Sequence, residues 1–391
     1  MREFKIDVPQ SQLDDLKQRL AATRWPDEMP GVGWSRGAPL SYIKELAEYW
    51  RTSFDWRAAE ARMNQFPHFL TEIDGVQVHF LHARSPEPNA MPLIITHGWP
   101  GSFVEFLDVI DPLVNPAAHG GDPADAFHVI IPSMPGYGFS GATHQLGWDT
   151  ERVALAWKEL MRRLGYTRYI AQGGDWGSPI SLRVGLADPE HVAGVHINMC
   201  VTLPPPDPAA MAQLMAELTE PDMERLQFGG YFFQDGFGWM KIQATRPQTL
   251  SYGLTDSPVG QLAWIAEKFK EWTDSTDRPE DAVSRDQMLT NVSLYWLTAT
   301  AGSSAQLYYE SEHLDADFGR TWAGPWPLAM PVGVAVFPKD ASRPIRSWAE
   351  NILPTLTRWT EFDRGGHFAA MEEPDLFVAD LRAFSRKLRE S

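Results

Sequence analysis

The chain has 391 residues and a formal net charge of −17, and 43% of its residues are hydrophobic. This length exceeds one average domain, and the apolar content is enough for a sizeable core. An acidic surface repels phosphate groups, so the composition argues against nucleic-acid binding and against anionic membranes as partners.

A single cysteine, Cys200, excludes an intrachain disulfide and a thiolate metal cluster. It lies in an apolar stretch, so we expect a buried, unreactive thiol. The charged N-terminus lacks the apolar core of a signal peptide, and no run of about 18 apolar residues occurs. We therefore expect a soluble, cytoplasmic protein.

Residues 1–72 are predicted to form a helical, aromatic-rich extension. Its first helix carries Leu13, Leu16 and Leu20 at helical spacing, with Ser11 as a candidate N-cap. We expect these helices to pack against the rest of the molecule, because they show no catalytic pattern.

Short apolar runs then alternate with helical segments, which is typical of a largely parallel sheet covered on both faces. The predicted strands lie at 92–97, 127–132, 169–174, 192–198 and 331–337. The fold class is therefore α/β.

The alternation is interrupted by a long helical stretch between two Pro-rich boundaries. The predicted organisation is an extension over 1–72, a first core part over 73–205, a helical lid over 206–328 and a second core part over 329–391. A lid is expected because ligands of open α/β sheets bind beyond the carboxyl ends of the strands.

The motif GGDWG, residues 173–177, follows a predicted strand and precedes a predicted helix. Its spacing matches a nucleophile elbow, in which small residues make room for a sharp turn. The central residue is Asp175, and a carboxylate can attack carbon to form an ester. An acidic helix cap would produce the same local pattern.

The motif HGWPGS, residues 97–102, follows the strand at 92–97. We expect the backbone N–H groups of Trp99 and Trp176 to form an oxyanion hole. His97 is expected to be structural, and a rigid turn would explain the motif equally well.

The segment GGHFAAMEEP contains His367, and VAVFPKD ends in Asp340. Asp340 lies between Asp175 and His367 in the chain, which is the α/β-hydrolase order of nucleophile, acid and histidine. His367 is the candidate base and Asp340 its orienting partner. Taken singly, a surface histidine and a turn aspartate are the alternatives.

Together with IPSMPGYGFS, ATRPQTLSYGLTDSPVGQLAWIAEKF and RGGHFAAMEEP, these motifs resemble the microsomal-type and fungal epoxide hydrolases that carry an N-terminal extension. The resemblance covers nearly the whole chain. It implies an α/β-hydrolase fold with a mostly parallel sheet, a helical lid, and an extension that wraps around core and lid. It also implies hydrolysis of an epoxide to a vicinal diol through a covalent ester on Asp175.

The resemblance further implies lid tyrosines that donate hydrogen bonds to the epoxide oxygen. Tyr308, in the segment ending YYE, matches one of them. Where the family usually has the second, this chain has Trp239, and Tyr231 lies nearby in the sequence. We expect Trp239 and Tyr231 to contact substrate.

No cofactor and no metal site are expected, because no metal-ligand spacing is visible. The expected partners are water and a small apolar or aryl epoxide, without nucleic acid or membrane; a homodimer stays open. Two alternatives remain at this point: a haloalkane dehalogenase, which also uses an aspartate in this elbow, and a non-catalytic scaffold that binds a small ligand.

Overall fold

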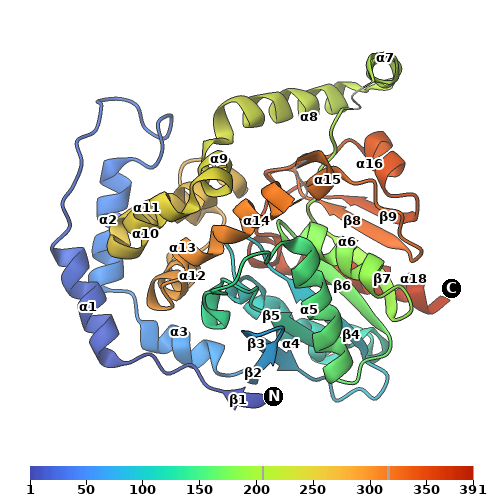
Figure 1. Ribbon diagram of the computed structural model, residues 1–391, viewed down its shortest axis with the longest axis horizontal. Helices are drawn as coiled ribbons and strands as arrows, with labels where there is room; N and C mark the ends of the chain where they lie inside the picture. The colour runs from blue at the N-terminus through green and yellow to red at the C-terminus, as the bar shows by residue number, and fades with distance from the viewer. Residues whose placement is uncertain (205–206, 315–317, 391) are drawn as a thin grey trace.

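The computed structural model describes residues 1–204, 207–314 and 318–390, and this part of the chain contains one nine-stranded sheet (Figure 1). The strand order is β1-β2-β3-β5-β4-β6-β7-β8-β9. The strands are β1 (Arg2–Phe4), β2 (His68–Ile73), β3 (Val76–Ala83), β4 (Met91–Thr96), β5 (Phe127–Pro132), β6 (Tyr169–Gly173), β7 (Val192–Ile197), β8 (Val332–Val336) and β9 (Leu356–Glu361).

Neighbouring strands from β5 to β9 are parallel, whereas β1, β2 and β3 pair antiparallel and join the rest through β5. The central parallel strands are almost continuously apolar because both of their faces are covered. Leu93 on β4 pairs with Ile170 on β6, and both are fully buried. The predicted α/β fold with a mostly parallel sheet is confirmed.

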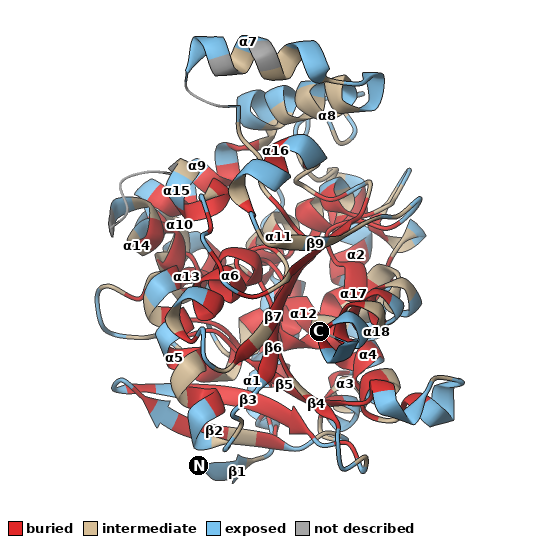
Figure 2. Cartoon of the chain, turned by 90° about the vertical axis from the view of Figure 1, so that its right-hand side faces the viewer, coloured by how far each residue is buried: buried red, intermediate tan, exposed pale blue. Residues whose placement is uncertain are grey.

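Helices cover the sheet on two sides (Figure 2). On one face lie α5 (Thr150–Arg163) and α6 (Gly177–Ala187); on the other lie α4 (Leu107–Val114), α17 (Ala369–Glu372) and α18 (Pro374–Glu390). Apolar residues at helical spacing account for this packing. In α18 the buried ones include Phe377, Leu381, Phe384 and Leu388. A further helix, α16 (Arg346–Ile352), connects β8 to β9.

The N-terminal region contains α1 (Gln10–Ala21), α2 (Leu40–Thr52) and α3 (Trp56–Met63), which contact α11 and α12 of the insertion described below. The prediction of a wholly helical region was wrong at its ends, because β1 and β2 join the sheet. The hairpin β2–β3 turns at Asp74 and Gly75, which both have positive φ. Such a two-residue turn matches the twist of paired strands.

Ser11 is not the N-cap of α1. The helix begins at Gln10 and Pro9 occupies the cap position, with no side-chain cap hydrogen bond. The fixed φ of proline, −56° here, is already close to that of a helix, so the helix begins earlier than the serine pattern predicts.

Between β7 and β8 the chain leaves the sheet and forms helices α7 to α15, which we call the helical insertion. They are α7 (Pro208–Glu217), α8 (Glu220–Tyr231), α9 (Gly238–Thr245), α10 (Pro247–Asp256), α11 (Pro258–Trp272), α12 (Arg285–Leu297), α13 (Ala301–Ser304), α14 (Gln306–Leu314) and α15 (Phe318–Ala323). Helices α7 and α8 lie at the outside of the molecule (Figures 1 and 2). Over the described ranges, none of the helices combines the length and the apolar character that crossing a membrane requires.

Candidate active site

Asp175 lies on a tight turn between β6 and α6 and has a φ of 50°. A Cβ on Gly177 would lie 1.9 Å from the carbonyl oxygen of Thr96, and one on Gly173 would lie 2.1 Å from that of Gly177. A positive φ costs free energy for a residue other than glycine, and such strained positions cluster at functional sites. The local sequence GGDWG therefore folds into the elbow that its glycines predict.

The Asp175 carboxylate is buried against the loop after β4. The backbone N–H of Trp99 donates to Oδ1 of Asp175 at 2.8 Å, and that of Trp176 also donates to this carboxylate. A Cβ on Gly98 would lie 2.1 Å from Oδ1, so only glycine fits there. Burial raises the pKa of Asp175, while His367 and the two N–H groups act to lower it. The two amides are thus aimed at an oxygen that can carry negative charge.

His367 is buried in the loop between β9 and α17. Its Nδ1 donates to Oδ1 of Asp340 at 2.7 Å, its Nε2 lies 3.6 Å from Oδ2 of Asp175, and its backbone N–H donates to the Trp272 carbonyl at 2.7 Å. Burial lowers the pKa of His367, but Asp340, Asp175 and Glu105 outweigh it and raise the pKa to about 9. The structure therefore brings the predicted residues Asp175, His367 and Asp340 into contact with one another.

His97 and Cys200 lie nearby but are occupied or inert. The backbone N–H of Met134 donates to His97 Nε2 at 3.1 Å, and Nδ1 donates to the Gly98 carbonyl at 2.9 Å. Burial lowers the pKa of His97 to about 4 and raises that of Cys200 to about 12. Neither side chain is placed to exchange protons with a ligand near neutral pH.

Aromatic rings from the helical insertion close over the carboxylate. The ring centroid of Tyr308 lies 4.8 Å from Trp176, 6.2 Å from Trp99 and 5.6 Å from Trp239, each pair in an edge-to-face arrangement. Trp239 stacks on Trp99 with centroids 5.0 Å apart. Ring contacts therefore hold the part of the site that comes from the helical insertion against the part that comes from the core.

The polar atoms of the Tyr308 and Trp239 side chains are buried and not engaged in hydrogen bonds with the described residues. Within the described residues, neither the Tyr308 hydroxyl nor the Trp239 indole N–H has a hydrogen-bond partner. Burial, with a contribution from Asp175, raises the pKa of Tyr308 well above its ordinary value. An unpaired buried donor costs about 1–3 kcal/mol, which an acceptor that reaches it would recover. Trp239 lines the cavity described next, whereas Tyr308 is fully buried and is not part of its wall.

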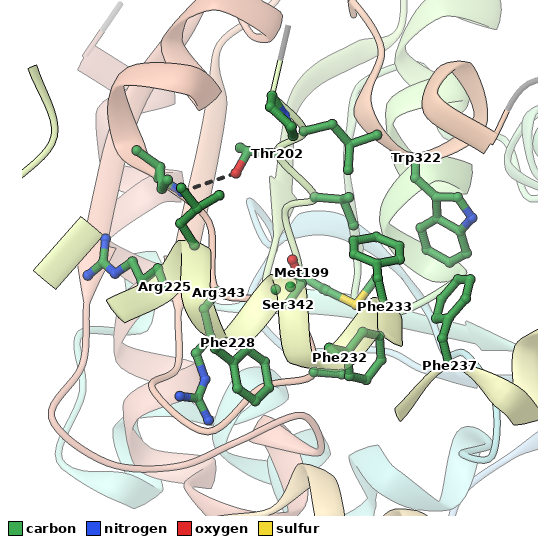
Figure 3. Close-up of a pocket in the computed structure, with 18 of the residues that line it drawn as sticks. Met199, Thr202, Arg225, Phe228, Phe232, Phe233, Phe237, Trp322, Ser342 and Arg343 are labelled. Carbon is green, nitrogen blue, oxygen red and sulfur yellow. Dashed lines mark hydrogen bonds between the residues drawn. The ribbon is translucent and has the colours of Figure 1, made fainter. Parts of the chain in front are cut away.

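A cavity of about 400 Å³ is lined by Asp175 and by residues of both the insertion and the core. Figure 3 shows part of its wall. Its walls are mainly apolar, and this size and character suit a small organic molecule. Prominent wall residues are Met199, Phe228, Phe232, Phe237, Trp239 and Trp322.

Tyr231 lies outside this arrangement. Its side chain is 59% exposed and does not contribute to the cavity wall, although its neighbours Gly230 and Phe232 do. It closes α8, and the helical turn there directs Phe232 inward and Tyr231 outward. This placement argues against the expectation that Tyr231 contacts substrate.

Two further residues of the site escaped sequence reasoning. Trp272, the last residue of α11, lies 4.9 Å from the His367 ring and 5.0 Å from Trp239. Glu105 lies in the 3-10 helix Phe103–Phe106 and interacts with His367 and Asp175. The available signal for Glu105 was a lone carboxylate in an apolar run directly after HGWPGS; Trp272 carried none.

Over the described residues, no group of three or more His, Cys, Asp or Glu side chains could hold a metal ion. The arrangement can supply a nucleophilic carboxylate and a base with its own carboxylate partner. It also offers hydrogen-bond donors from the core loops and from the helical insertion.

A parallel sheet with a strained elbow and a histidine–carboxylate pair defines an α/β hydrolase whose nucleophile position holds an aspartate. Residues 91–374 match the family model for the alpha/beta hydrolase fold, and residues 1–106 match the model described as the epoxide hydrolase N terminus. The chain belongs to the epoxide hydrolase family.

Relatives and solved structures agree with this assignment. The chain is 50% identical to a protein of Stigmatella aurantiaca over 99% of its own length and 85% of that protein, and 36% identical to epoxide hydrolase 1 of Sus scrofa, covering 100% and 89%. It superposes on the juvenile hormone epoxide hydrolase of Bombyx mori with a TM-score of 0.90 at 31% identity, covering 100% and 95%. For the Aspergillus niger epoxide hydrolase the TM-score is 0.85 at 32% identity, covering 99% and 96%.

Proposed function

We propose that this protein hydrolyses an apolar epoxide to a vicinal diol through a covalent ester on Asp175. The observation that carries the proposal is the position of Asp175, a buried carboxylate between an apolar cavity and the His367–Asp340 pair. Proteins named as epoxide hydrolases match nearly the full length of this chain. They favour epoxide hydrolysis over the two alternatives, dehalogenation and ligand binding without turnover.

In the first step Asp175 attacks a ring carbon of the epoxide. The new carbon–oxygen ester bond forms as the strained ring bond breaks, and the ring oxygen takes a proton from the Tyr308 hydroxyl. Tyr308 is suited to this role because its donor is buried beside Asp175 and unoccupied within the described part of the chain. Trp239 contributes a second N–H that can donate but not release its proton.

In the second step water attacks the ester carbonyl. His367, held by Asp340, takes one proton from the water, and the amides of Trp99 and Trp176 stabilise the oxyanion. Collapse of this adduct releases the diol, which receives its proton from His367. The proton left on Asp175 replaces the one that Tyr308 gave up, so that one epoxide and one water yield one diol.

The helical insertion acts as the lid of this site, with the sequence-derived limits 206–328, while residues 1–72 brace it from outside. Contacts of α1 and α2 with α11 support the second role. The apolar wall of the cavity favours alkyl and aryl epoxides over strongly charged ones.

A single turnover in heavy-oxygen water tests the covalent route. With an aryl epoxide and excess enzyme, the label should enter Asp175, and the first diol should carry the unlabelled carboxylate oxygen. Mass measurement of the peptide containing Asp175 and of the diol gives both values. Label appearing directly in the first diol would mean that water opens the ring, and a chloroalkane assayed for halide release tests the dehalogenase alternative.

A further inference from the structure

A second, much smaller cavity also borders Asp175. Its volume is about 10 Å³, which is close to the space that one water molecule needs. Asp175 borders both cavities, whereas His367, Glu105 and Asn198 line only the small one. A water also needs two or more polar partners, and these side chains can supply them.

The loop after β4 is shaped to place the Glu105 carboxyl in this wall. A Cβ on Gly101 would lie 1.4 Å from Oε1 of Glu105, just as one on Gly98 would lie 2.1 Å from Oδ1 of Asp175. The two glycines of HGWPGS thus make room for two different carboxyl groups. The Ser102 backbone N–H donates to Glu105 and fixes it there.

Glu105 is electrostatically part of the site. Burial raises its pKa to about 8, Asp175 adds to the rise, and His367 opposes it. Glu105 in turn contributes to the raised pKa of His367. The group therefore holds a proton near neutral pH in the free enzyme, and its charge depends on the state of Asp175.

Water must reach the ester carbonyl while the alkyl part of the intermediate still fills the apolar cavity. The small cavity, which both Asp175 and His367 line, gives it a separate place beside the ester. We infer that Glu105 is a further catalytic residue, which holds the hydrolytic water in the small cavity by accepting a hydrogen bond while His367 takes the other proton. This inference rests on the proposed function.

The test compares Glu105→Leu and Glu105→Gln with the wild type in single turnovers, with ester formation and ester hydrolysis measured separately by rapid-quench mass spectrometry. Leu removes the acceptor, so hydrolysis should slow by ~10²-fold while alkylation changes by less than about threefold. Gln keeps an acceptor oxygen and should restore most of the hydrolysis rate. Glu267→Leu is the matched control, since Glu267 is a partly buried acid with a raised pKa that lines neither cavity; its ratio of the two rates should equal that of the wild type.

Wild-type hydrolysis in Glu105→Leu would overturn the inference, and so would an equal loss in both steps, which marks a purely structural role. Hydrolysis in Glu105→Gln as slow as in Glu105→Leu would also overturn it, because the group would then act as a charge and not as a holder of water. If the wild type itself forms no ester from epoxides, the proposed function fails first, and the same experiment shows this separately.

Discussion

The two halves of the site are built on opposite principles. The half that comes from the sheet consists of Asp175, His367 and Asp340, each already in hydrogen bonds or ion pairs. The half that comes from the helical insertion offers Tyr308 and Trp239, whose donor atoms are buried without a partner among the described residues. Most polar atoms of the sheet half are thus paired before substrate binds, although Oδ2 of Asp340 has no partner among the described residues. In the proposed mechanism the insertion half is completed by the substrate oxygen.

This difference has an energetic meaning. A largely satisfied polar network holds its side chains in place. Each unpaired buried donor, in contrast, costs about 1–3 kcal/mol that an incoming acceptor can recover. In the proposed mechanism the protein therefore fixes Asp175 and His367, and leaves the hydrogen bonds from Tyr308 and Trp239 to be gained on binding.

The largest effect is expected from the sheet half. Asp175→Ala should lower turnover by ~10⁴-fold or more and form no ester, because no other carboxylate occupies the elbow. His367→Ala should lose turnover to a similar extent but still form the ester, which would accumulate as added mass on the peptide containing Asp175. Steady-state diol assays and mass measurement distinguish the two; ester formation in Asp175→Ala would remove this residue from the mechanism.

A smaller effect is expected from the insertion half. Tyr308→Phe removes one positioned donor and should slow alkylation by ~10²–10³-fold. Trp239→Phe keeps a ring against Trp99 and removes only a weaker donor, so alkylation should fall by much less. Pre-steady-state ester formation in both variants is the measurement. Near wild-type alkylation in Tyr308→Phe would show that another group donates to the epoxide oxygen.

Glu105, which interacts with Asp175 and His367 of the sheet half, should also make stability depend on pH. Its folded-state pKa of about 8 lies above the ordinary value of 4.5, so the folded state binds this proton more tightly than the unfolded state. The free energy of unfolding therefore falls by up to about 1.4 kcal/mol per pH unit as pH rises from 4.5 towards 8, and this loss is absent in Glu105→Gln. Denaturant unfolding of both proteins across this window should show a difference that grows with pH.

Asp175, His367 and Glu372 also titrate close to Glu105 and are present in both proteins, so the difference reports Glu105 together with its electrostatic coupling to these groups. Trp239→Phe provides the matched comparison from the insertion half, because it changes no charge. Its difference from the wild type should stay flat with pH. A flat difference for Glu105→Gln as well would mean that Glu105 has no raised pKa.

The smallest effect is expected at Tyr231. Because this side chain is 59% exposed and outside the cavity wall, Tyr231→Phe should change the rate of alkylation by less than about twofold. Phe232→Ala, at the adjacent wall position, should weaken apparent substrate binding instead. A large loss of alkylation in Tyr231→Phe would mean that the end of α8 reorganises around substrate.

The sheet half could be predicted from the sequence because its geometry is local. Asp175, Trp176 and Trp99 sit in short loops directly after buried strands, where glycine spacing limits the backbone to one sharp turn. His367 and Asp340 follow strands that end at the same edge of a parallel sheet, so chain order was sufficient to place them together.

The insertion half could not be predicted in this way. Whether Tyr231 or Phe232 faces the cavity depends on the rotation of one helix turn, and Trp272 reaches His367 only through the packing of α11 on the core. The strand β2 was missed for a related reason, since its pairing depends on β3 and not on its own pattern. The role of Glu105 could not be predicted either, because it follows from the burial of the side chain, which the sequence does not show.

The loop that carries His367 is also joined to the insertion by hydrogen bonds from backbone N–H groups to a carbonyl and to two carboxylates. The His367 N–H donates to the Trp272 carbonyl, the Gly365 N–H donates to Oδ2 of Asp274, and Glu372 accepts from the Asp274 N–H. The insertion is therefore not an exchangeable module. A chimaera that takes its helices from a relative with another substrate range would have to inherit residues 272–274 together with 365–372, or it would gain a new cavity and lose the position of its base.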